Sequence, residues 1–375
     1  MGKIYTSLGL MSGTSMDGID LSIIRSNGEN EYVAVFDKYF EYDKGLYQDL
    51  TNLRCKIKSS KDLKFQVEIV KSLEKKITLF HAKVTNEVLK ESNINIDFIG
   101  FHGQTIFHNA EEKLSKQLGD GKLLSSLTKK TVVYDFRQND LIKEGQGAPL
   151  APIFHQLIVN KNKIDLPVCI LNIGGVANLT IITSHEVNNL KSYDIGPGNC
   201  LIDDWIRKKI KKKYDENGKS AKLGKTNEII LNQALDNFNY KKNKSNLSFD
   251  VKDFDLNFVR GFSLEDGASV LTDFTGKIIT SSLISLLSIE KNKVWKVLIC
   301  GGGRKNSYLM ENIKKINSKN FVIQTIDSYG INGDFVESQA FAFLAIRSHL
   351  NLPISFPNTT GCNEPCTGGV IVKNY

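Results

Sequence analysis

The sequence predicts an α/β fold with two related lobes. Strand-like apolar segments alternate with segments of helical apolar spacing along the 375-residue chain. A unit of strand, glycine turn and strand occurs twice, with turns at Gly13 and Gly174, so the repeat spans 174 − 13 = 161 positions. Hydrophobic residues make up 41% of the chain and charged residues 24%, which suffices for a sizeable core and excludes global disorder.

The first half of the chain opens with three expected strands, around a polar glycine turn at 12–18. These are Tyr5–Met11, Ile19–Ser26 and Glu31–Tyr42. Apolar residues at helical spacing predict a helix over Leu63–Leu89. Two short buried strands follow, Phe98–Phe101 and Thr131–Phe136; the first leads into 102–105 and the second into Arg137.

The second half repeats this pattern and then extends it. The expected strands are Pro167–Ile173, Ala177–Thr183, Lys191–Tyr193, Val294–Cys300 and Phe321–Thr325. The expected helices are Cys200–Lys212, Glu228–Phe238, Asp266–Leu287, Ser307–Ile316 and Asp334–Leu350. Between them, 211–244 is polar and lysine-rich, which predicts a surface excursion.

Charge and cysteine content set bounds on location and partners. Lysine plus arginine is 49 and aspartate plus glutamate 41, a net charge of +8 that no segment concentrates beside a motif, so we expect no nucleic-acid partner. The six cysteines are too sparse for a disulfide scaffold, and Cys362 and Cys366 have no nearby histidine for a zinc site. With neither a signal peptide nor a membrane span expected, the predicted location is the cytoplasm.

Gly13–Gly18 is the densest motif. Its two glycines allow close backbone approach, its hydroxyls and amides suit phosphate oxygens, and Asp17 or Asp20 could hold magnesium. The alternative is an ordinary hairpin turn, for which Asp-Gly alone is a good signal.

Three charged residues are candidates for catalysis or substrate binding, each with a plainer alternative. Asp194, before a glycine loop, is placed for general-base work or for an Asx turn. Arg137 could bind a substrate carboxylate or form a salt bridge between lobes, and Glu337 is either a cap-region acid or a site carboxylate.

Two common nucleotide motifs are excluded. The Gly-Lys pairs at 218–219 and 224–225 lack the glycine that a Walker loop places five positions earlier. Gly301-x-Gly303 lacks the third glycine of a dinucleotide fingerprint, because Asn306 stands there.

Taken together, nine segments in order resemble the 1,6-anhydro-N-acetylmuramic acid kinases, over nearly the whole chain. They are Met11–Asp20 (MSGTSMDGID), Gly100–Thr105 (GFHGQT), Asp135–Asp140 (DFRQND), Gly145–Pro149 (GQGAP), Asn172–Asn178 (NIGGVAN), Asp194–Asn199 (DIGPGN), Asp266–Ala268 (DGA), Gly301–Asn306 (GGGRKN) and Glu337–Ala342 (ESQAFA).

The resemblance implies the actin, heat-shock chaperone and sugar-kinase fold: two RNase-H-like lobes with an interlobe cleft for ATP and substrate. The lobes are expected at 1–150 plus 351–375 and at 151–350. It implies a catalytic base, Asp194, helped by Glu337, and a substrate cleft near Gln104, Arg137 and Asp194. The implied nucleotide-binding residues are Gly13, Thr14, Ser15, Met16, Asp17, Gly18, Ile19, Asp20, Gly174, Gly175, Asn178, Gly301, Gly302, Gly303 and Asn306.

The implied reaction uses ATP, Mg²⁺ and water to open 1,6-anhydro-N-acetylmuramic acid and phosphorylate its O6, in peptidoglycan recycling. The resemblance also implies a homodimer. Two alternatives stay open: another kinase or a phosphatase of the same fold, and a non-enzymatic ATP-binding module.

Overall fold

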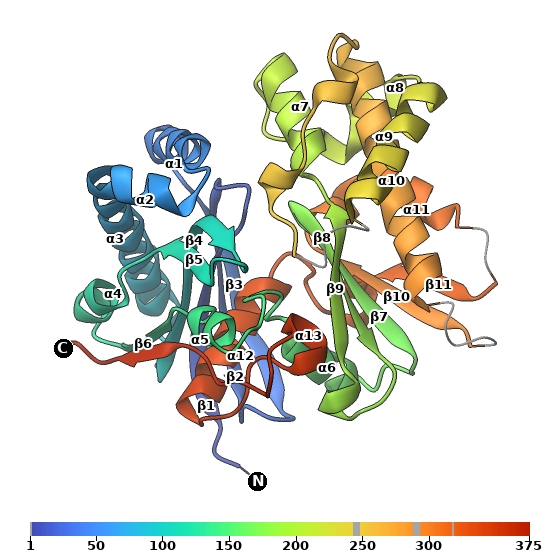
Figure 1. Cartoon of the computed structure of the whole chain (residues 1–375). Coiled ribbons are helices and arrows are strands. Elements are labelled where there is room, and N and C mark those ends of the chain that lie inside the picture. Colours follow the sequence, from blue (N-terminus) through green and yellow to red (C-terminus); the bar gives the residue numbers. More distant parts are fainter. Residues whose placement is uncertain (1, 243–247, 288–292, 317–318) are drawn as a thin grey trace. The chain divides into compact units, whose positions relative to one another are not determined.

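The chain forms two compact units, each built around its own β-sheet (Figure 1). The computed structural model describes residues 2–242, 248–287, 293–316 and 319–375. Unit 1 comprises Met1–Ile164, His185–Lys191 and Phe335–Tyr375. Unit 2 comprises Asp165–Ser184 and Ser192–Asp334.

The sheet of unit 1 has the strand order β12-β6-β4-β1-β2-β3, with β5 paired to β4. β2 runs antiparallel to β1 and β3, whereas β4 is parallel to β1 and β6 is parallel to β4. The strands are β1 Tyr5–Ser12, β2 Gly18–Ser26, β3 Tyr32–Glu41, β4 Phe98–Asn109, β5 Leu114–Leu118, β6 Thr131–Tyr134 and β12 Val370–Val372.

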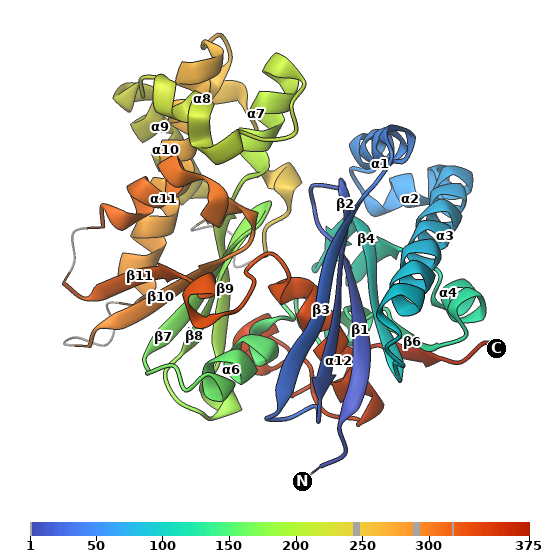
Figure 2. The ribbon, with the colours of Figure 1, turned by 180° about the vertical axis from the view of Figure 1, so that it is seen from behind.

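Helices pack against both faces of this sheet (Figure 2). They are α1 Lys44–Lys56, α2 Ser60–Phe65, α3 Val67–Ser92, α4 Gly121–Thr128, α5 Gln138–Ile142, α6 Pro152–Lys161, α12 Val336–His349 and α13 Pro357–Thr360. Because strand side chains alternate between faces, Leu8 and Leu10 join the cluster that includes α1 and α3, whereas Gly9 faces α12.

α12 lies unusually close to its face of the sheet. A Cβ built on Gly9 would stand 1.9 Å from the carbonyl oxygen of Ser338, and one on Gly100 would stand 2.1 Å from that of Phe341. Only residues without a side chain fit at such distances, so these two glycines fix the depth at which α12 packs.

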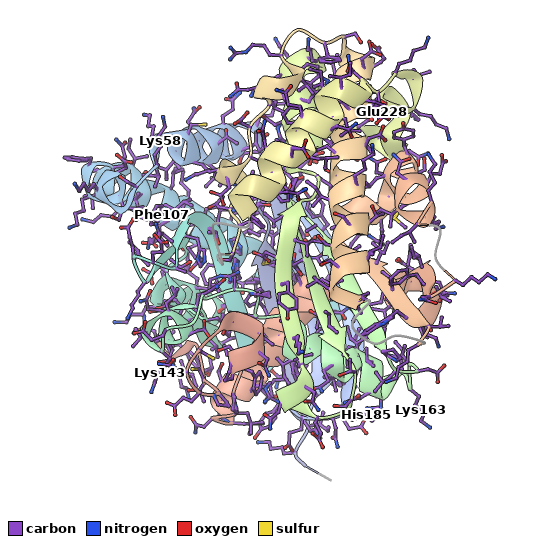
Figure 3. All side chains as sticks on the ribbon, turned by 45° about the vertical axis from the view of Figure 1, so that its right-hand side comes forward. Lys58, Phe107, Lys143, Lys163, His185 and Glu228 are labelled. Atoms are coloured by element: carbon purple, nitrogen blue, oxygen red, sulfur yellow. The ribbon has the colours of Figure 1, made fainter. Side chains whose placement is uncertain are left out.

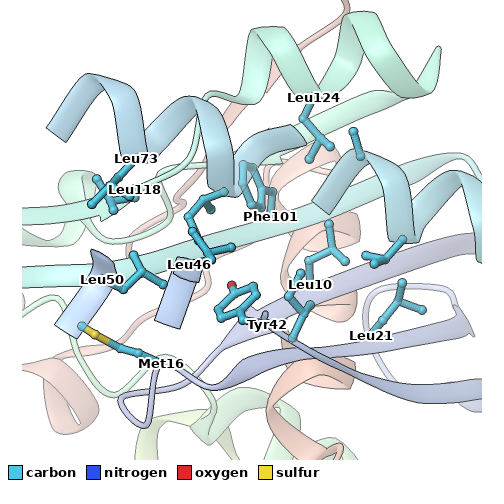
Figure 4. Close-up of a cluster of buried hydrophobic side chains, with 14 of the residues drawn as sticks. Leu10, Met16, Leu21, Tyr42, Leu46, Leu50, Leu73, Phe101, Leu118 and Leu124 are labelled. Carbon is cyan, nitrogen blue, oxygen red and sulfur yellow. The ribbon is translucent and has the colours of Figure 1, made fainter. Parts of the chain in front are cut away.

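The opposite face carries the main core of unit 1 (Figure 4). Leucines of α1 and α3 meet Phe101 of β4 and Leu10 of β1 there, and Met16 enters the same cluster from the turn between β1 and β2. The first glycine turn is therefore continuous with the core.

Unit 2 has the strand order β11-β10-β7-β8-β9. β8 is antiparallel to β7, β10 is parallel to β7, and β11 is parallel to β10. The strands are β7 Val168–Ile173, β8 Val176–Ile182, β9 Lys191–Pro197, β10 Trp295–Cys300 and β11 Phe321–Thr325. The helices are α7 Cys200–Ile210, α8 Lys219–Leu223, α9 Glu228–Lys242, α10 Leu264–Leu287 and α11 Ser307–Lys314.

Both units thus share one strand order: a hairpin, a third strand beside its second strand, and two parallel strands on the other side. This is the order of an RNase-H-like lobe. The predicted α/β fold with two related lobes is confirmed, and the glycine turns at Gly13 and Gly174 occupy equivalent hairpins.

The lobe boundaries differ from the predicted ones. α6 and α12 fall in the range 151–350, expected in the second lobe, but both belong to unit 1. Phe154 of α6 packs against Phe343 of α12 and Tyr32 of β3, with ring centroids 5.6 and 5.1 Å apart. The chain returns to the first unit at Phe335 because the close contact of α12 with β1 and β4 requires it.

Several element bounds also differ. The helix expected over 63–89 is broken at Gln66 into α2 and α3, β4 continues to Asn109, and β9 continues to Pro197. α1, α4, α5, α6, α8 and α13 have no counterpart among the expected helices, and β5 and β12 have none among the expected strands.

α10 is long and apolar enough to cross a membrane by composition, but 61% of its most apolar window is buried inside the structure. Its apolar residues pack against α7, α8, α9 and α11. Its composition is that of a core helix.

Lysines extend from the surface, as Lys58, Lys143 and Lys163 illustrate (Figure 3). The lysines of 208–213 are exposed, as the sequence predicts. The second expected lysine run, 241–244, ends outside the described residues.

Candidate functional site

The turn between β1 and β2 is held by main-chain contacts at both ends. Within it, the Met16 N–H donates to the Gly13 carbonyl at 3.2 Å, and Met16 adopts a left-handed φ of 58°. At its end, the Tyr42 N–H donates to the Asp17 carbonyl at 2.9 Å. The Ser15 hydroxyl donates to the Asp17 carboxylate.

Two side chains from other elements fix the carbonyls of this turn. Gln104 Nε2 donates to the Gly13 carbonyl at 2.9 Å, and Arg54 Nη1 donates to the Thr14 carbonyl at 2.6 Å. Since each side chain comes from a packed element, β4 or α1, the turn has a defined backbone conformation.

A buried polar chain lies directly beneath the turn. His81 Nδ1 is 2.8 Å from the Ile77 carbonyl and therefore carries the proton, so Nε2 accepts from the Ser12 hydroxyl at 3.3 Å. Ser12 Oγ in turn accepts from the Tyr42 hydroxyl at 2.8 Å. Burial lowers the pKa of His81 to about 4, which keeps this network neutral near pH 7.

The residues of the turn divide into exposed and buried groups. Thr14 and Ser15 are exposed, and a Cβ on Gly13 would meet no atom nearer than 3.9 Å, so a ligand could approach the backbone here. Gly18, in contrast, packs against Phe40 and Tyr39. Met16 and Ile19 place their side chains in the core, which leaves their main-chain atoms as the groups available to a ligand.

The two predicted metal residues, Asp17 and Asp20, belong to no group of three or more ligating side chains in the described part of the chain. Among the described residues, one group of three ligating side chains lies close enough to share an ion, and it is Asp140, Cys362 and Cys366. Magnesium is commonly bound through one or two carboxylates plus phosphate oxygens, so the chemistry of Asp17 and Asp20 fits such a role.

Asp140 instead supports the loop at 145–149. Its carboxylate accepts from the Gly147 N–H at 2.7 Å and from the Thr360 hydroxyl at 2.6 Å, and a Cβ on Gly145 would stand 2.1 Å from it. Burial raises the pKa of the neighbouring Cys366 to about 12, so this thiol stays protonated.

Arg137 is held by the same loop. Its Nη1 donates to the Gly147 carbonyl at 2.7 Å, and Nε and Nη2 approach His102 Nε2 at 3.2 and 2.9 Å. His102 Nδ1 is 2.8 Å from the Gly103 carbonyl, so Nε2 is the acceptor. Burial, and then the charge of Arg137, holds the pKa of His102 well below its usual value, as this neutral form requires.

Gln104 is fully buried in β4, and its Oε1 has no hydrogen-bond partner. The strand that contains it does not end before the polar segment, as the sequence suggested, but carries that segment in its middle. Its established contact is the Gly13 carbonyl, so the second and first motifs meet here.

Glu337 lies in the first turn of α12, half-buried. The next two residues anchor that turn: the Ser338 and Ser22 hydroxyls are 2.6 Å apart, and Gln339 Nε2 donates to both oxygens of Asp37 at 3.1 Å. Burial raises the pKa of Asp37, although the hydrogen bonds from Ser22 and Gln339 oppose it. These contacts fix the first turn of α12, and Glu337 with it.

In unit 2, the second glycine turn joins the N-terminus of α7. The Gly175 carbonyl accepts from the Gly198 N–H at 2.9 Å and the Gly174 carbonyl from the Asn199 N–H at 2.8 Å. A Cβ on Gly198 would stand 2.2 Å from the Gly174 carbonyl, whereas one on Gly174 would meet nothing nearer than 3.6 Å. Gly174 therefore leaves open backbone that a ligand can approach.

The third glycine segment, 301–303, lies against the same turn. Gly303 packs on Ile173, and Gly301 lies beside Asn172 with a φ of 80°. A Cβ on Gly302 would meet no atom nearer than the Asn199 side chain, at 3.8 Å. Asn306 caps α11 by accepting from the Leu309 N–H at 3.0 Å, so its carboxamide oxygen already serves the helix.

Arg304 clamps this segment. It binds Asp327 through Nε and Nη2 at 2.8 and 3.0 Å, and its Nη1 reaches Asp334 at 2.6 Å and the Gly301 carbonyl at 3.1 Å. The bonds from Arg304 lower the pKa of Asp327, and together with Lys305 they outweigh burial to lower that of Asp334.

Asp194 lies within β9 rather than after it. Its carboxylate accepts from the Phe249 N–H at 3.0 Å, and Phe249 packs against Phe238 and Phe254 with centroids 5.8 and 5.5 Å away. The segment after the lysine-rich excursion thus contacts the predicted base.

The structure therefore gathers the predicted residues into two groups. Unit 1 holds the turn 13–20 with Gln104, and also Arg137 and Glu337 on neighbouring elements. Unit 2 brings Gly174, Gly175 and 301–303 together at one edge of its sheet and places Asp194 on the strand leading to α7. Asn178 stands opposite Asn172 in the hairpin register.

Six further residues contact these groups and are not predicted as site residues from the sequence. They are Tyr42, Arg54, His81, Phe249, Asp327 and Asp334. Each lies far along the chain from the segment it contacts. Arg304, which binds Asp327 and Asp334, itself lies within the motif GGGRKN.

Comparisons with known proteins find a matching family model and curated relatives. The model of a family described as anhydro-N-acetylmuramic acid kinase matches residues 5–374. A curated relative of that name from Pelagibacter ubique (strain HTCC1062) is 60% identical over 375 residues, covering 100% of both chains. One from Agrobacterium fabrum (strain C58 / ATCC 33970) is 37% identical over 379 residues, again covering 100% of both.

Among solved structures, a hexokinase from Schistosoma mansoni complexed with glucose shares 9% identity at a TM-score of 0.42, covering 91% of this chain and 85% of that one. A likeness that distant supports no conclusion.

Proposed function

The chain belongs to the anhydro-N-acetylmuramic acid kinase family, and on that premise we propose that it uses ATP and water to open 1,6-anhydro-N-acetylmuramic acid and to phosphorylate O6. The products are N-acetylmuramate 6-phosphate and ADP. The observation that carries this proposal is the 60% identity over the full length of a relative with that name.

Asp194 is proposed as the general base. A carboxylate that accepts a proton from water makes the oxygen nucleophilic toward the anomeric carbon. The bond from that carbon to O6 breaks, and O6 takes the γ-phosphoryl group of ATP, so ring opening supplies the phosphoryl acceptor. The Phe249 N–H supports this role because it fixes one carboxylate oxygen of Asp194.

Glu337 is proposed to orient the attacking water. Its place in the first turn of α12 supports this role, since Ser338 and Gln339 anchor that turn to β2 and β3. A carboxylate in a fixed position can hold the water in the geometry for attack, and correct geometry accounts for a large part of the rate gained by binding a nucleophile.

The three glycine segments are proposed to bind the nucleotide. Gly13 and Gly174 leave space where a side chain would stand, the feature that lets backbone amides approach phosphate oxygens, and 301–303 is proposed to contact the adenosine. Mg²⁺, held by Asp17 or Asp20, would neutralise phosphate charge. Phosphoryl transfer depends mainly on such positioning and electrostatics.

Arg137 is proposed to bind the lactyl carboxylate of the sugar. Its contacts with His102 and the Gly147 carbonyl fix the guanidinium while it keeps its charge, because both partners are neutral acceptors. Gln104, buried behind the first turn, is proposed to act through Gly13.

Further properties are proposed from family resemblance. The protein is expected to act on a small-molecule sugar in the cytoplasm, as part of peptidoglycan recycling and as a homodimer. The oligomeric state is measurable by light scattering.

The direct test is an ADP-release assay across a panel of sugars, with the phosphorylated position found by phosphorus NMR. We expect release that requires 1,6-anhydro-N-acetylmuramic acid and a product phosphorylated on O6. Equal release with glucose or N-acetylglucosamine would identify a different kinase of this fold.

A further inference from the structure

Arg54 contacts the first glycine turn but lies outside all nine motifs. Its Nη1 donates to the Thr14 carbonyl over 2.6 Å, a short hydrogen bond from a charged donor. Its side chain is half-buried and comes from the last turn of α1.

α1 is itself fixed relative to the turn. Asp43 caps its first turn by accepting from the Leu46 N–H at 2.9 Å. Leu46 and Leu50 enter the cluster that also contains Met16, as Figure 4 shows. The turn and the helix that carries Arg54 are therefore packed into the same core.

The contact determines where the peptide groups of the turn point. In a trans peptide the C=O and the following N–H point in opposite directions. Because Arg54 holds the Thr14 carbonyl and Gln104 the Gly13 carbonyl, the N–H groups of Ser15 and Thr14 point away from these two anchors. Two successive amides directed away from their anchors, beside exposed hydroxyls, are typical of an anion-binding turn.

We propose that Arg54 is a positioning residue for nucleotide binding: it orients the Thr14–Ser15 peptide toward a phosphate oxygen and places a positive charge on the other side of that peptide. This inference rests on the proposed function, because that function makes the turn a nucleotide-phosphate site. The charge matters here because Asp17 and Asp20, on the same hairpin, are acidic and repel an anion whenever no metal ion is bound to them.

The test measures nucleotide binding without sugar. Arg54→Met and Arg54→Lys are compared with the native chain by titration calorimetry of ADP and of a non-hydrolysable ATP analogue. Lys56→Met, an exposed lysine on the same helix, is the matched control because it removes the same charge. We expect Arg54→Met to weaken binding about tenfold, with a shallower salt dependence.

Arg54→Lys keeps the charge but not the bidentate reach of a guanidinium, and is expected to lose less affinity. If Arg54 only connects α1 to the hairpin, Arg54→Met will have a lower unfolding midpoint and an unchanged nucleotide affinity. That result would overturn the proposal. So would an equal loss of affinity in Lys56→Met. Should Arg54→Met fail to fold, the affinity of Arg54→Lys decides: a value equal to the native one refutes the positioning role.

The outcome is separable from that of the proposed function. If nucleotide binds and depends on Arg54 while no anhydro-sugar is turned over, the proposed reaction is wrong and the role of Arg54 stands. If the native enzyme turns over the sugar and Arg54→Met has unchanged nucleotide affinity and KM for ATP, the proposed reaction stands and the role of Arg54 is wrong.

Discussion

The sharpest structural prediction concerns Gly9. In Gly9→Ala the new Cβ would stand 1.9 Å from the Ser338 carbonyl oxygen and 2.6 Å from the Ala342 nitrogen, both main-chain atoms. Ordinary contact begins at 3.4 Å, so α12 must retreat by about 1.5 Å or the strand must bend. Overpacking against backbone costs about 3 kcal/mol, because no side chain can rotate away.

The same displacement reaches the proposed site. A shift of α12 separates the Ser338 hydroxyl from Ser22 and moves Glu337, one residue earlier. Misplacement of about 1 Å costs on the order of 100-fold in rate, so folded Gly9→Ala is expected to lose both stability and kcat.

Urea unfolding followed by circular dichroism gives the stability, and ADP release at a temperature where the variant is folded gives kcat. Gly2→Ala is the control, because its Cβ would meet no atom nearer than 3.8 Å. An unfolding midpoint of Gly9→Ala equal to that of the native chain would refute the packing argument.

Three further predictions concern other parts of the molecule. Asp194→Asn is expected to abolish turnover while ATP still binds by calorimetry; native turnover would refute its role as base. Burial lowers the pKa of His155 to about 3, so below about pH 6.5 only the unfolded state takes its proton and stability falls. His155→Phe should lose about 2 kcal/mol less unfolding free energy between pH 7 and pH 5 than the native chain, and an equal slope would contradict this. Arg304→Met should cost about 2 kcal/mol, because it leaves Asp327 without this cation and Asp334 with Lys305 alone. Both acids have a lowered pKa, so their contribution exists above about pH 4 and is lost on acidification; the variant should therefore show a smaller loss of stability there than the native chain.

The sequence predicts the fold well where one local pattern decides. Period-two and period-3.6 apolar spacing locate most strands and long helices, and two glycine hairpins reveal the internal repeat. The sequence predicts that the strand ends at Phe101, because His102 and Gln104 are polar, yet both are buried in β4, where they contact Arg137 and Gly13. Polar residues predict the end of a strand unless the hydrogen-bond partners that bury them are known.

The sequence does not predict where an element packs when distant parts of the chain determine its position. α12 follows unit 2 in the chain but packs in unit 1, and the residues that allow it, Gly9 and Gly100, lie more than 200 positions earlier. Arg54 has no motif around it, because its role arises from where α1 ends relative to the turn. The motifs predict which segments carry the chemistry, whereas these supporting contacts depend on the folded chain.

The proposed reaction is tested most directly by running it in heavy-oxygen water. Water attack on the anomeric carbon, with O6 accepting the phosphoryl group, predicts a sugar phosphate that carries the heavy oxygen on the anomeric carbon and none in its phosphoryl group. Analysis must be prompt and include a control for exchange of the free product. Heavy oxygen in released inorganic phosphate, with the sugar unlabelled and unopened, would contradict the account, because water would then attack ATP rather than the sugar.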